Sequence, residues 1–274
     1  MTSSDLVLSA STRQVTTLTM NLPKRLNGWT VEMLAALRDA LGRAARDDGT
    51  RAVVLTATDP YYSAGVNLSG TLGLSHPRTL HRRIVEHNEA LFNGFIDFPK
   101  PILAAVNGPA IGAAVTTATL CDALLASERA TFSTPFARLG VPAEGCSSVQ
   151  FARFMGEPNA QRMLGAEGWI PTGTEAAAVG LATAVVPHDQ LLAEAQRIAE
   201  GWVEEGRTRT YRAGATIDEL HAINARESVE VATAFLSPPF LEAQYRFLRS
   251  RKKRGPAAMF FALWRTHRVW SKLL

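Results

Sequence analysis

The sequence contains few of the residues and motifs on which metal and redox sites depend. Only two of its 274 residues are cysteines, and they do not form a CxxC pair. The six histidines show no ligand spacing such as HExxH, and neither GxGxxG nor GK[ST] occurs. We therefore expect no bound metal and no disulfide framework, and free thiols of this kind are typical of a reducing, cytoplasmic compartment.

The sequence also lacks a clear targeting or membrane-spanning segment. Residues 1–10 contain neither a basic region nor an apolar stretch, so no signal peptide is expected. The uncharged stretch 101–121 is long enough to span a bilayer, but its prolines, glycines and Asn107 favour a buried strand, a turn and a buried helix. The last four residues, SKLL, resemble a peroxisomal address with an extra leucine. A cytoplasmic protein is predicted.

Acidic residues are absent from one basic stretch near the C-terminus. The net charge is +4, and six basic residues lie between positions 246 and 254. Such a run attracts polyanions such as nucleic acid, anionic lipid or cofactor phosphates, or it is a solvated helix end. Without interleaved aromatic residues or a known module, nucleic-acid binding is not expected. The apolar tail 255–274 either packs on the protein or lies at a membrane surface, and packing is the commoner outcome.

The hydrophobic pattern predicts alternating strands and helices. Strands are expected at 6–9, 15–20, 52–57, 102–106, 123–126 and 131–133, and helices at 31–45, 77–97 and 111–119. This order favours an α/β fold with parallel strands and helical crossovers. Beyond residue 147 the pattern is mostly helical. We predict a core at 1–200, a helical or oligomerisation region at 201–254 and an apolar, basic tail at 255–274.

Two glycine-containing loops each follow a predicted buried strand. They are residues 62–68 (YSAGVNL) and 107–114 (NGPAIGAA). Small residues allow a ligand to approach the backbone closely, and N–H groups at the start of a helix favour an oxyanion. If the loops meet, they would form an oxyanion hole for a thioester carbonyl. The alternative is a pair of tight turns between packed elements.

These loops resemble those of the crotonase (enoyl-CoA hydratase/isomerase) superfamily. The similarity runs from about residue 5 to 253 and includes the early loop at 21–27 (NLPKRLN) as well as residues 63–68 and 108–122. The resemblance implies a crotonase-like ββα spiral with two near-perpendicular sheets and a C-terminal helical subdomain. It further implies a homotrimer or hexamer and an acyl-CoA thioester substrate, so that CoA is part of the substrate and no separate cofactor is needed.

The same resemblance implies roles for residues of the loops. The oxyanion donors would be the N–H groups of Val66 and Ala113. Glycine is common where Ala113 stands, but alanine retains the N–H. Four residues would contact the CoA moiety: Lys24, Arg25, Ala64 and Leu68.

The positions of carboxylates distinguish reactions within the superfamily. Its hydratases use two glutamates, at positions that correspond here to Thr116 and most nearly to Phe136. Neither side chain can transfer a proton in that role, so a hydratase is disfavoured. Residues 139–148 (LGVPAEGCSS) instead resemble the peroxisomal-type Δ3,Δ2-enoyl-CoA isomerases, whose single catalytic glutamate follows a proline directly. Here Ala143 separates that proline from Glu144, the implied catalytic residue.

One carboxylate is sufficient to move a double bond. Glu144 would remove a proton from C2 to give a dienolate and would return it at C4. Each well-placed N–H donor would stabilise the oxyanion by ~3–4 kcal/mol. An apolar pocket would raise the pKa of Glu144, and the candidates for this pocket are Phe132, Phe136, Thr116, Val141 and Leu68. Two alternatives stay open: another acyl-CoA activity of the superfamily, as a hydratase or hydrolase, and a non-catalytic acyl-CoA-binding protein.

Overall fold

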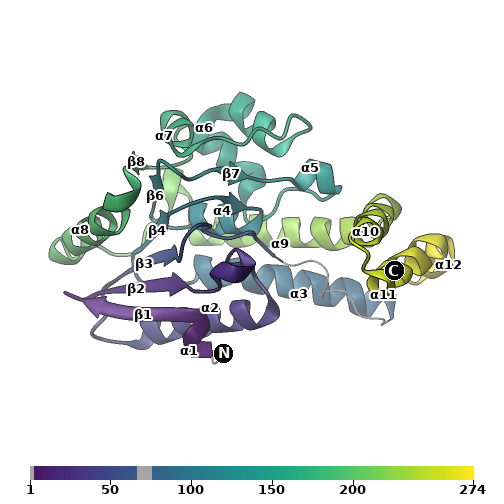
Figure 1. The fold of residues 1–274 in the computed structure, drawn as a ribbon, viewed down its shortest axis with the longest axis horizontal. Coiled ribbons are helices and arrows are strands. Elements are labelled where there is room, and N and C mark those ends of the chain that lie inside the picture. Colours follow the sequence, from purple (N-terminus) through teal and green to yellow (C-terminus); the bar gives the residue numbers. More distant parts are fainter. Residues whose placement is uncertain (1–2, 67–75) are drawn as a thin grey trace.

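A six-stranded sheet forms the centre of the protein. The computed structural model describes residues 3–66 and 76–274 (Figure 1). The strands lie in the order β1-β2-β3-β4-β6-β8, and only the β1–β2 hairpin is antiparallel. Their bounds are β1 Val7–Thr12, β2 Val15–Met20, β3 Ala52–Ala57, β4 Ile102–Val106, β6 Ala123–Ser127 and β8 Ala184–Val186. The predicted parallel strands with helical crossovers are therefore present.

Both faces of this sheet are covered, as expected for parallel strands. Val54 and its neighbours on one face pack against α8 (Leu191–Glu204) through Leu191, Ala195 and Trp202. Val53 and its neighbours on the other face belong to the largest core, which also contains residues of α2 and α3. Because side chains alternate along a strand, the continuous apolar run 52–57 supplies both cores.

A second, two-stranded sheet lies beside the first. It pairs β5 (Ala110–Ile111) with β7 (Phe132–Ser133) in parallel. The predicted helix 111–119 therefore starts two residues late, as α4 (Ala113–Thr119), because Ala110 and Ile111 are held in this pairing. Small residues let α4 be buried along its whole length.

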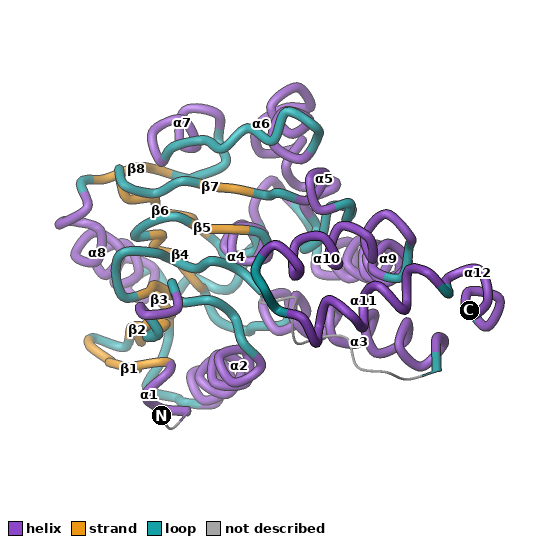
Figure 2. The backbone as a smooth tube through the Cα atoms, turned by 45° about the vertical axis from the view of Figure 1, so that its right-hand side comes forward, coloured by secondary structure: helices purple, strands orange, loops and turns teal. Residues whose placement is uncertain are grey.

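The remaining helices surround the sheets and extend beyond them. The bounds are α1 Ser3–Leu6, α2 Val31–Arg46, α3 Pro77–Ile96, α5 Phe136–Leu139, α6 Ser147–Leu164, α7 Gly173–Val179, α9 Ile217–Phe235, α10 Pro238–Ser250, α11 Arg254–Arg265 and α12 His267–Trp270. Helix α9 lies along α3, and α10 to α12 project away from the sheets at its C-terminal end (Figures 1 and 2).

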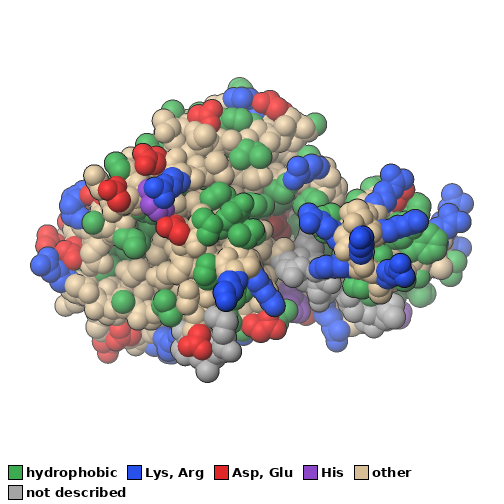
Figure 3. All heavy atoms as spheres, viewed as in Figure 1, with side chains coloured by type: hydrophobic (Ala, Val, Ile, Leu, Met, Phe, Trp, Pro, Cys, Tyr) green, Lys and Arg blue, Asp and Glu red, His purple; other side chains and the backbone are tan. Residues whose placement is uncertain are grey.

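The C-terminal tail packs on this projecting region. Ala257 and Phe260 are buried in a separate apolar cluster with Phe240 and Leu248 of α10 and Leu80 of α3. Basic side chains gather over the same region (Figure 3). No helix in the described part of the chain is long and apolar enough to cross a membrane. The division at residues 200 and 254 stays a prediction.

Candidate active site

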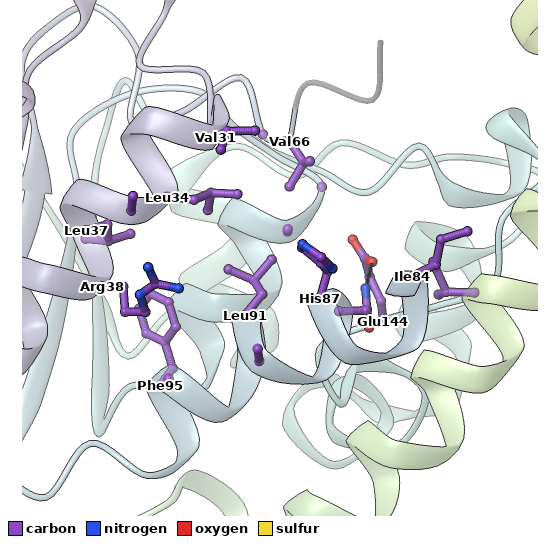
Figure 4. A pocket seen from close by; sticks show the side chains of 18 of the residues that line it. Val31, Leu34, Leu37, Arg38, Val66, Ile84, His87, Leu91, Phe95 and Glu144 are labelled. Atoms are coloured by element: carbon purple, nitrogen blue, oxygen red, sulfur yellow. Dashed lines mark hydrogen bonds between the residues drawn. The ribbon is translucent and has the colours of Figure 1, made fainter. Parts of the chain in front are cut away.

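A cavity of about 890 Å³ lies between α2, α3 and the two glycine loops. Most of its wall is apolar, with Leu34, Leu37, Leu91 and Phe95 on one side and Ile84 on the other (Figure 4). Both loops and Glu144 line it. A largely apolar cavity with a few polar groups is the usual form of a small-molecule site.

The two glycine loops meet at one edge of this cavity. Ser63 forms a parallel bridge with Ala110, and the Ile111 N–H donates to the Ser63 carbonyl at 3.0 Å. Gly65 has a φ of 78°, and a Cβ there would collide with the Ile111 carbonyl oxygen. Glycine is therefore required at position 65 for the loops to approach one another this closely.

The two candidate donors for an oxyanion hole are the N–H groups of Val66 and Ala113, one from each loop. Val66 directly follows Gly65, and Ala113 is the first residue of α4, where N–H groups have no partner within the helix. Within residues 3–66 and 76–274, neither N–H donates to a backbone carbonyl. Both residues line the cavity.

Glu144 lies in the turn between α5 and α6 and contributes its carboxyl group to the cavity wall (Figure 4). The next two residues, Gly145 and Cys146, both have a φ of 65°. A Cβ on Gly145 would lie 2.6 Å from the Thr116 hydroxyl and 2.5 Å from the Phe92 ring. The turn is thus pressed against α3 and α4, which fixes where the glutamate side chain begins.

Burial raises the pKa of Glu144 to about 7. Asn88 opposes this shift: its Nδ2 donates to Glu144 Oε2 at 2.8 Å, which favours the charged form. The charge of Glu227 raises the pKa further. A carboxyl whose pKa lies near neutrality can both accept and return a proton under physiological conditions.

Asn88 is itself held in one orientation. Its Oδ1 accepts a hydrogen bond from Ser228 Oγ on α9 at 2.8 Å. The amide carbonyl therefore faces Ser228, and the NH₂ group faces Glu144. Helices α3 and α9 together orient the carboxyl group of the candidate base.

The structure brings some of the other predicted site residues to the cavity and not others. Ala64, Phe136 and Val141 line it. Thr116 and Phe132 do not: both side chains are fully buried, one beneath Gly145 and the other in the main core.

Three residues assigned to CoA lie away from the cavity wall or cannot be placed. Lys24 and Arg25 are exposed in a 3-10 turn (Pro23–Arg25) and do not line the cavity, so they could contact only a part of a ligand that extends outside it. Leu68 lies outside the described residues.

Three polar residues near the cavity were not predicted from the sequence: Asn88, Ser228 and His87. Asn88 and Ser228 are polar residues within long amphipathic helices, where a solvent-facing position is the usual interpretation. His87 lines the cavity, and its Nδ1 lies 2.7 Å from the Arg83 carbonyl oxygen. Because a carbonyl only accepts, Nδ1 carries a proton. No spacing motif marks any of the three residues.

Comparison with known proteins identifies the family of this chain. The sequence profile of the enoyl-CoA hydratase/isomerase family matches residues 10–240. The chain belongs to this family. The enoyl-CoA hydratase/isomerase of Pseudoalteromonas atlantica has a similar structure, with a TM-score of 0.74 and 30% identity, over 89% of this chain and 97% of that one. The predicted crotonase-like fold class and superfamily are thereby confirmed.

Family members with isomerase in their names are also similar in sequence. Human enoyl-CoA delta isomerase 2 is 35% identical over 248 residues, which cover 87% of this chain and 62% of the human protein. Mouse peroxisomal enoyl-CoA delta isomerase 3 is 38% identical over 66% of this chain and 57% of its own length. The chain thus spans less than two thirds of each of these two relatives.

Proposed function

We propose that the protein is a Δ3,Δ2-enoyl-CoA isomerase that moves a C3–C4 double bond to C2–C3. The observation that carries the proposal is the placement of Glu144 in the wall of a largely apolar cavity that Val66 and Ala113 also line. Relatives named as enoyl-CoA delta isomerases support the same reaction.

The carboxylates of the cavity favour a single acid–base group. Among the described lining residues, Glu144 and Asp97 are the acids. Asp97 directly follows α3, and its Oδ1 lies 2.8 Å from His221 Nε2. It lies nine positions after Asn88, roughly 13 Å along the helix axis at 1.5 Å per residue. Asp97 is therefore too far from the carboxyl that Asn88 holds for the two to act on neighbouring carbons.

The proposed reaction follows from these positions. The thioester oxygen accepts hydrogen bonds from the N–H groups of Val66 and Ala113. Each donor stabilises the negative charge that develops on this oxygen by ~3–4 kcal/mol. The Glu144 carboxylate removes the C2 proton, and the electron pair moves into a dienolate. The protonated carboxyl then delivers the proton to C4, the new double bond lies between C2 and C3, and the carboxylate is restored.

The apolar wall of the cavity supports this chemistry in two ways. Phe136 and Val141 exclude water from the dienolate, which limits competing protonation from solvent. The same low-polarity surroundings keep Glu144 a stronger base than an exposed carboxylate.

A direct assay tests the proposal. Purified protein is incubated with a 3-enoyl-CoA, and the conjugated 2-enoyl thioester is followed by its absorbance. A 2-enoyl-CoA is supplied in parallel, and 3-hydroxyacyl-CoA is sought by chromatography. We expect isomerisation by the wild type and none by Glu144→Gln. Hydration without isomerisation would identify a hydratase, and binding without turnover would identify an acyl-CoA-binding protein.

The assembly and location of the protein are further proposals. Family resemblance supports a homotrimer or a hexamer, with Lys24 and Arg25 close to the CoA phosphates. The two free cysteines favour a reducing compartment such as the cytoplasm. Sedimentation analysis distinguishes the two assemblies, and replacement of both basic residues by Gln should raise KM for the CoA ester without lowering kcat.

A further inference from the structure

A second buried glutamate lies behind the candidate active site. Glu227 on α9 is 0% exposed, yet it does not line the cavity and has no part in the proposed proton transfer. Burial of a carboxyl is costly unless hydrogen bonds compensate for the lost water. Its partners therefore indicate what it does.

Both oxygens of Glu227 accept backbone N–H groups from the turn that carries Glu144. Oε2 accepts from the Cys146 N–H at 2.7 Å, and Oε1 accepts from the Ser148 N–H at 3.0 Å. These donors lie at the N-terminal end of α6, where the helix dipole favours a negative charge. The Glu227 carboxyl thus fixes the start of α6, which begins three residues after Glu144.

The same turn needs such support because its backbone is unusual. Cys146 has a φ of 65°, a left-handed conformation that a non-glycine residue adopts at a cost of roughly 1–2 kcal/mol. The hydrogen bond from its N–H to Glu227 offsets this cost. Without the bond, the turn would be free to relax and the Glu144 side chain would begin from a different position.

We propose that Glu227 is a positioning residue, which holds the Glu144 turn through two backbone N–H groups and strengthens Glu144 as a base through its negative charge. The inference rests on the proposed isomerase function. Helix α9 then fixes Glu144 in two ways. Glu227 holds the backbone of its turn, and the neighbouring Ser228 orients Asn88, which binds the Glu144 carboxyl.

The charges around the two carboxyls are consistent with this role. Burial raises the pKa of Glu227 to about 7, and hydrogen bonds from Ser148 and Cys146 oppose the shift. Because both of its oxygens accept N–H groups, we assign the first ionisation of the pair to Glu227.

Few other charged groups face the pair. Arg226 lowers the pKa of Glu227 slightly, but its guanidinium also contacts Ser148 and Glu230 on the outer face of α9. On the cavity side, His87 and Arg83 of α3 line the same wall as Glu144. A negative charge on Glu227 therefore acts on Glu144 from behind, on the side away from the substrate.

Two substitutions distinguish the effect of the negative charge of Glu227 from the effect of its side-chain length. Glu227→Gln keeps the size but removes the charge and one acceptor, so the acidic midpoint of the kcat–pH profile should fall by about one pH unit and kcat by about tenfold. Glu227→Asp keeps the charge on a shorter side chain, so kcat should fall while the midpoint stays in place. KM should change little in both variants, since neither touches the cavity.

Glu230→Gln on the outer face of the same helix is the matched control and should leave kcat and the midpoint unchanged. An unmoved midpoint and full kcat in Glu227→Gln would overturn the proposal. If neither Glu227 variant folds, as judged by circular dichroism, the residue is a requirement of the fold and the proposal is rejected.

One measurement keeps the test independent of turnover. The carboxyl of Glu144 is titrated by NMR in protein labelled with ¹³C-glutamate, with Glu144→Gln used to assign the signal. A lower midpoint for this signal in Glu227→Gln supports the inference even if the wild type isomerises no substrate, an outcome that would refute only the proposed function. An unchanged signal refutes the inference alone.

Discussion

Replacing Glu144 with glutamine should stabilise the fold at alkaline pH while it removes activity. The reason is that burial raises the pKa of this carboxyl from its ordinary value of 4.5 to about 7. Below pH 4.5 the group is protonated in both the folded and the unfolded chain, and it causes no penalty. As the pH rises towards 7, the unfolded chain releases this proton more readily than the folded one. The folded state therefore loses stability over this interval.

The size of the effect follows from the same two pKa values. At 1.36 kcal/mol for each pH unit, the interval from 4.5 to about 7 corresponds to roughly 3 kcal/mol. Glu144 is partly open to the cavity, so solvent reduces this figure, and we expect about 1–3 kcal/mol. Glutamine is neutral and retains an oxygen that can accept from Asn88. For a chain of this size the gain corresponds to a rise in Tm of roughly 2–10 °C.

Thermal unfolding of the wild type and Glu144→Gln at pH 4.5 and pH 8 measures this difference. The two melting temperatures should coincide at pH 4.5, and the variant should be the more stable protein at pH 8. Glu86→Gln, at an exposed position on α3, serves as the control without a pH-dependent gain. A variant that is less stable than the wild type at pH 8, or equally stabilised at both pH values, would refute the reasoning about burial.

Three further predictions concern the surroundings of Glu144 and the core. Asn88→Leu removes the hydrogen bond that favours the charged form of Glu144, so the midpoint of the kcat–pH profile should rise and kcat should fall about tenfold. Gly65→Ala forces the two glycine loops apart and should lower kcat/KM about a hundredfold in steady-state assays, whereas Gly201→Ala, in an open position on α8, should stabilise the fold by up to ~1 kcal/mol. Asp122→Ala leaves Arg209 buried without its partner at 2.6 Å and should cost about 3–5 kcal/mol in urea unfolding.

Local sequence patterns predicted the central strands well. The strands 52–57 and 102–106 have the predicted bounds, because each is a short apolar run that is buried on both faces. Helix α2 begins at Val31, as predicted, and its first turn is capped by the Thr30 hydroxyl. The start of α4 was misplaced because it depends on the pairing of Ala110 with Phe132 of β7, which lies 22 positions later in the chain.

The candidate site was only partly predictable for the same reason. The loop residues Gly65 and Ala113 and the candidate base Glu144 lie in motifs that can be recognised in sequence. The residues that support Glu144 lie in no such motif, because they are distant in the sequence. Asn88 precedes Glu144 by 56 positions, and Glu227 follows Cys146 by 81 positions. Their roles depend on the packing of α9 between α3 and the start of α6, which no local periodicity specifies.

The packing beneath Glu144 also favours the proposed use of one acid rather than two. Hydratases of the superfamily are expected to have a glutamate at the position of Thr116, and here that side chain lies directly against Gly145. Even one added carbon at Gly145 would lie within 3 Å of Thr116, so a glutamate at 116 could fit only if the turn moved away. Such a movement would displace Glu144 and break the contacts of Cys146 and Ser148 with Glu227. The turn that positions Glu144 therefore occupies the space that a second glutamate at position 116 would need. In this chain the proposed arrangement with one acid excludes an arrangement with two.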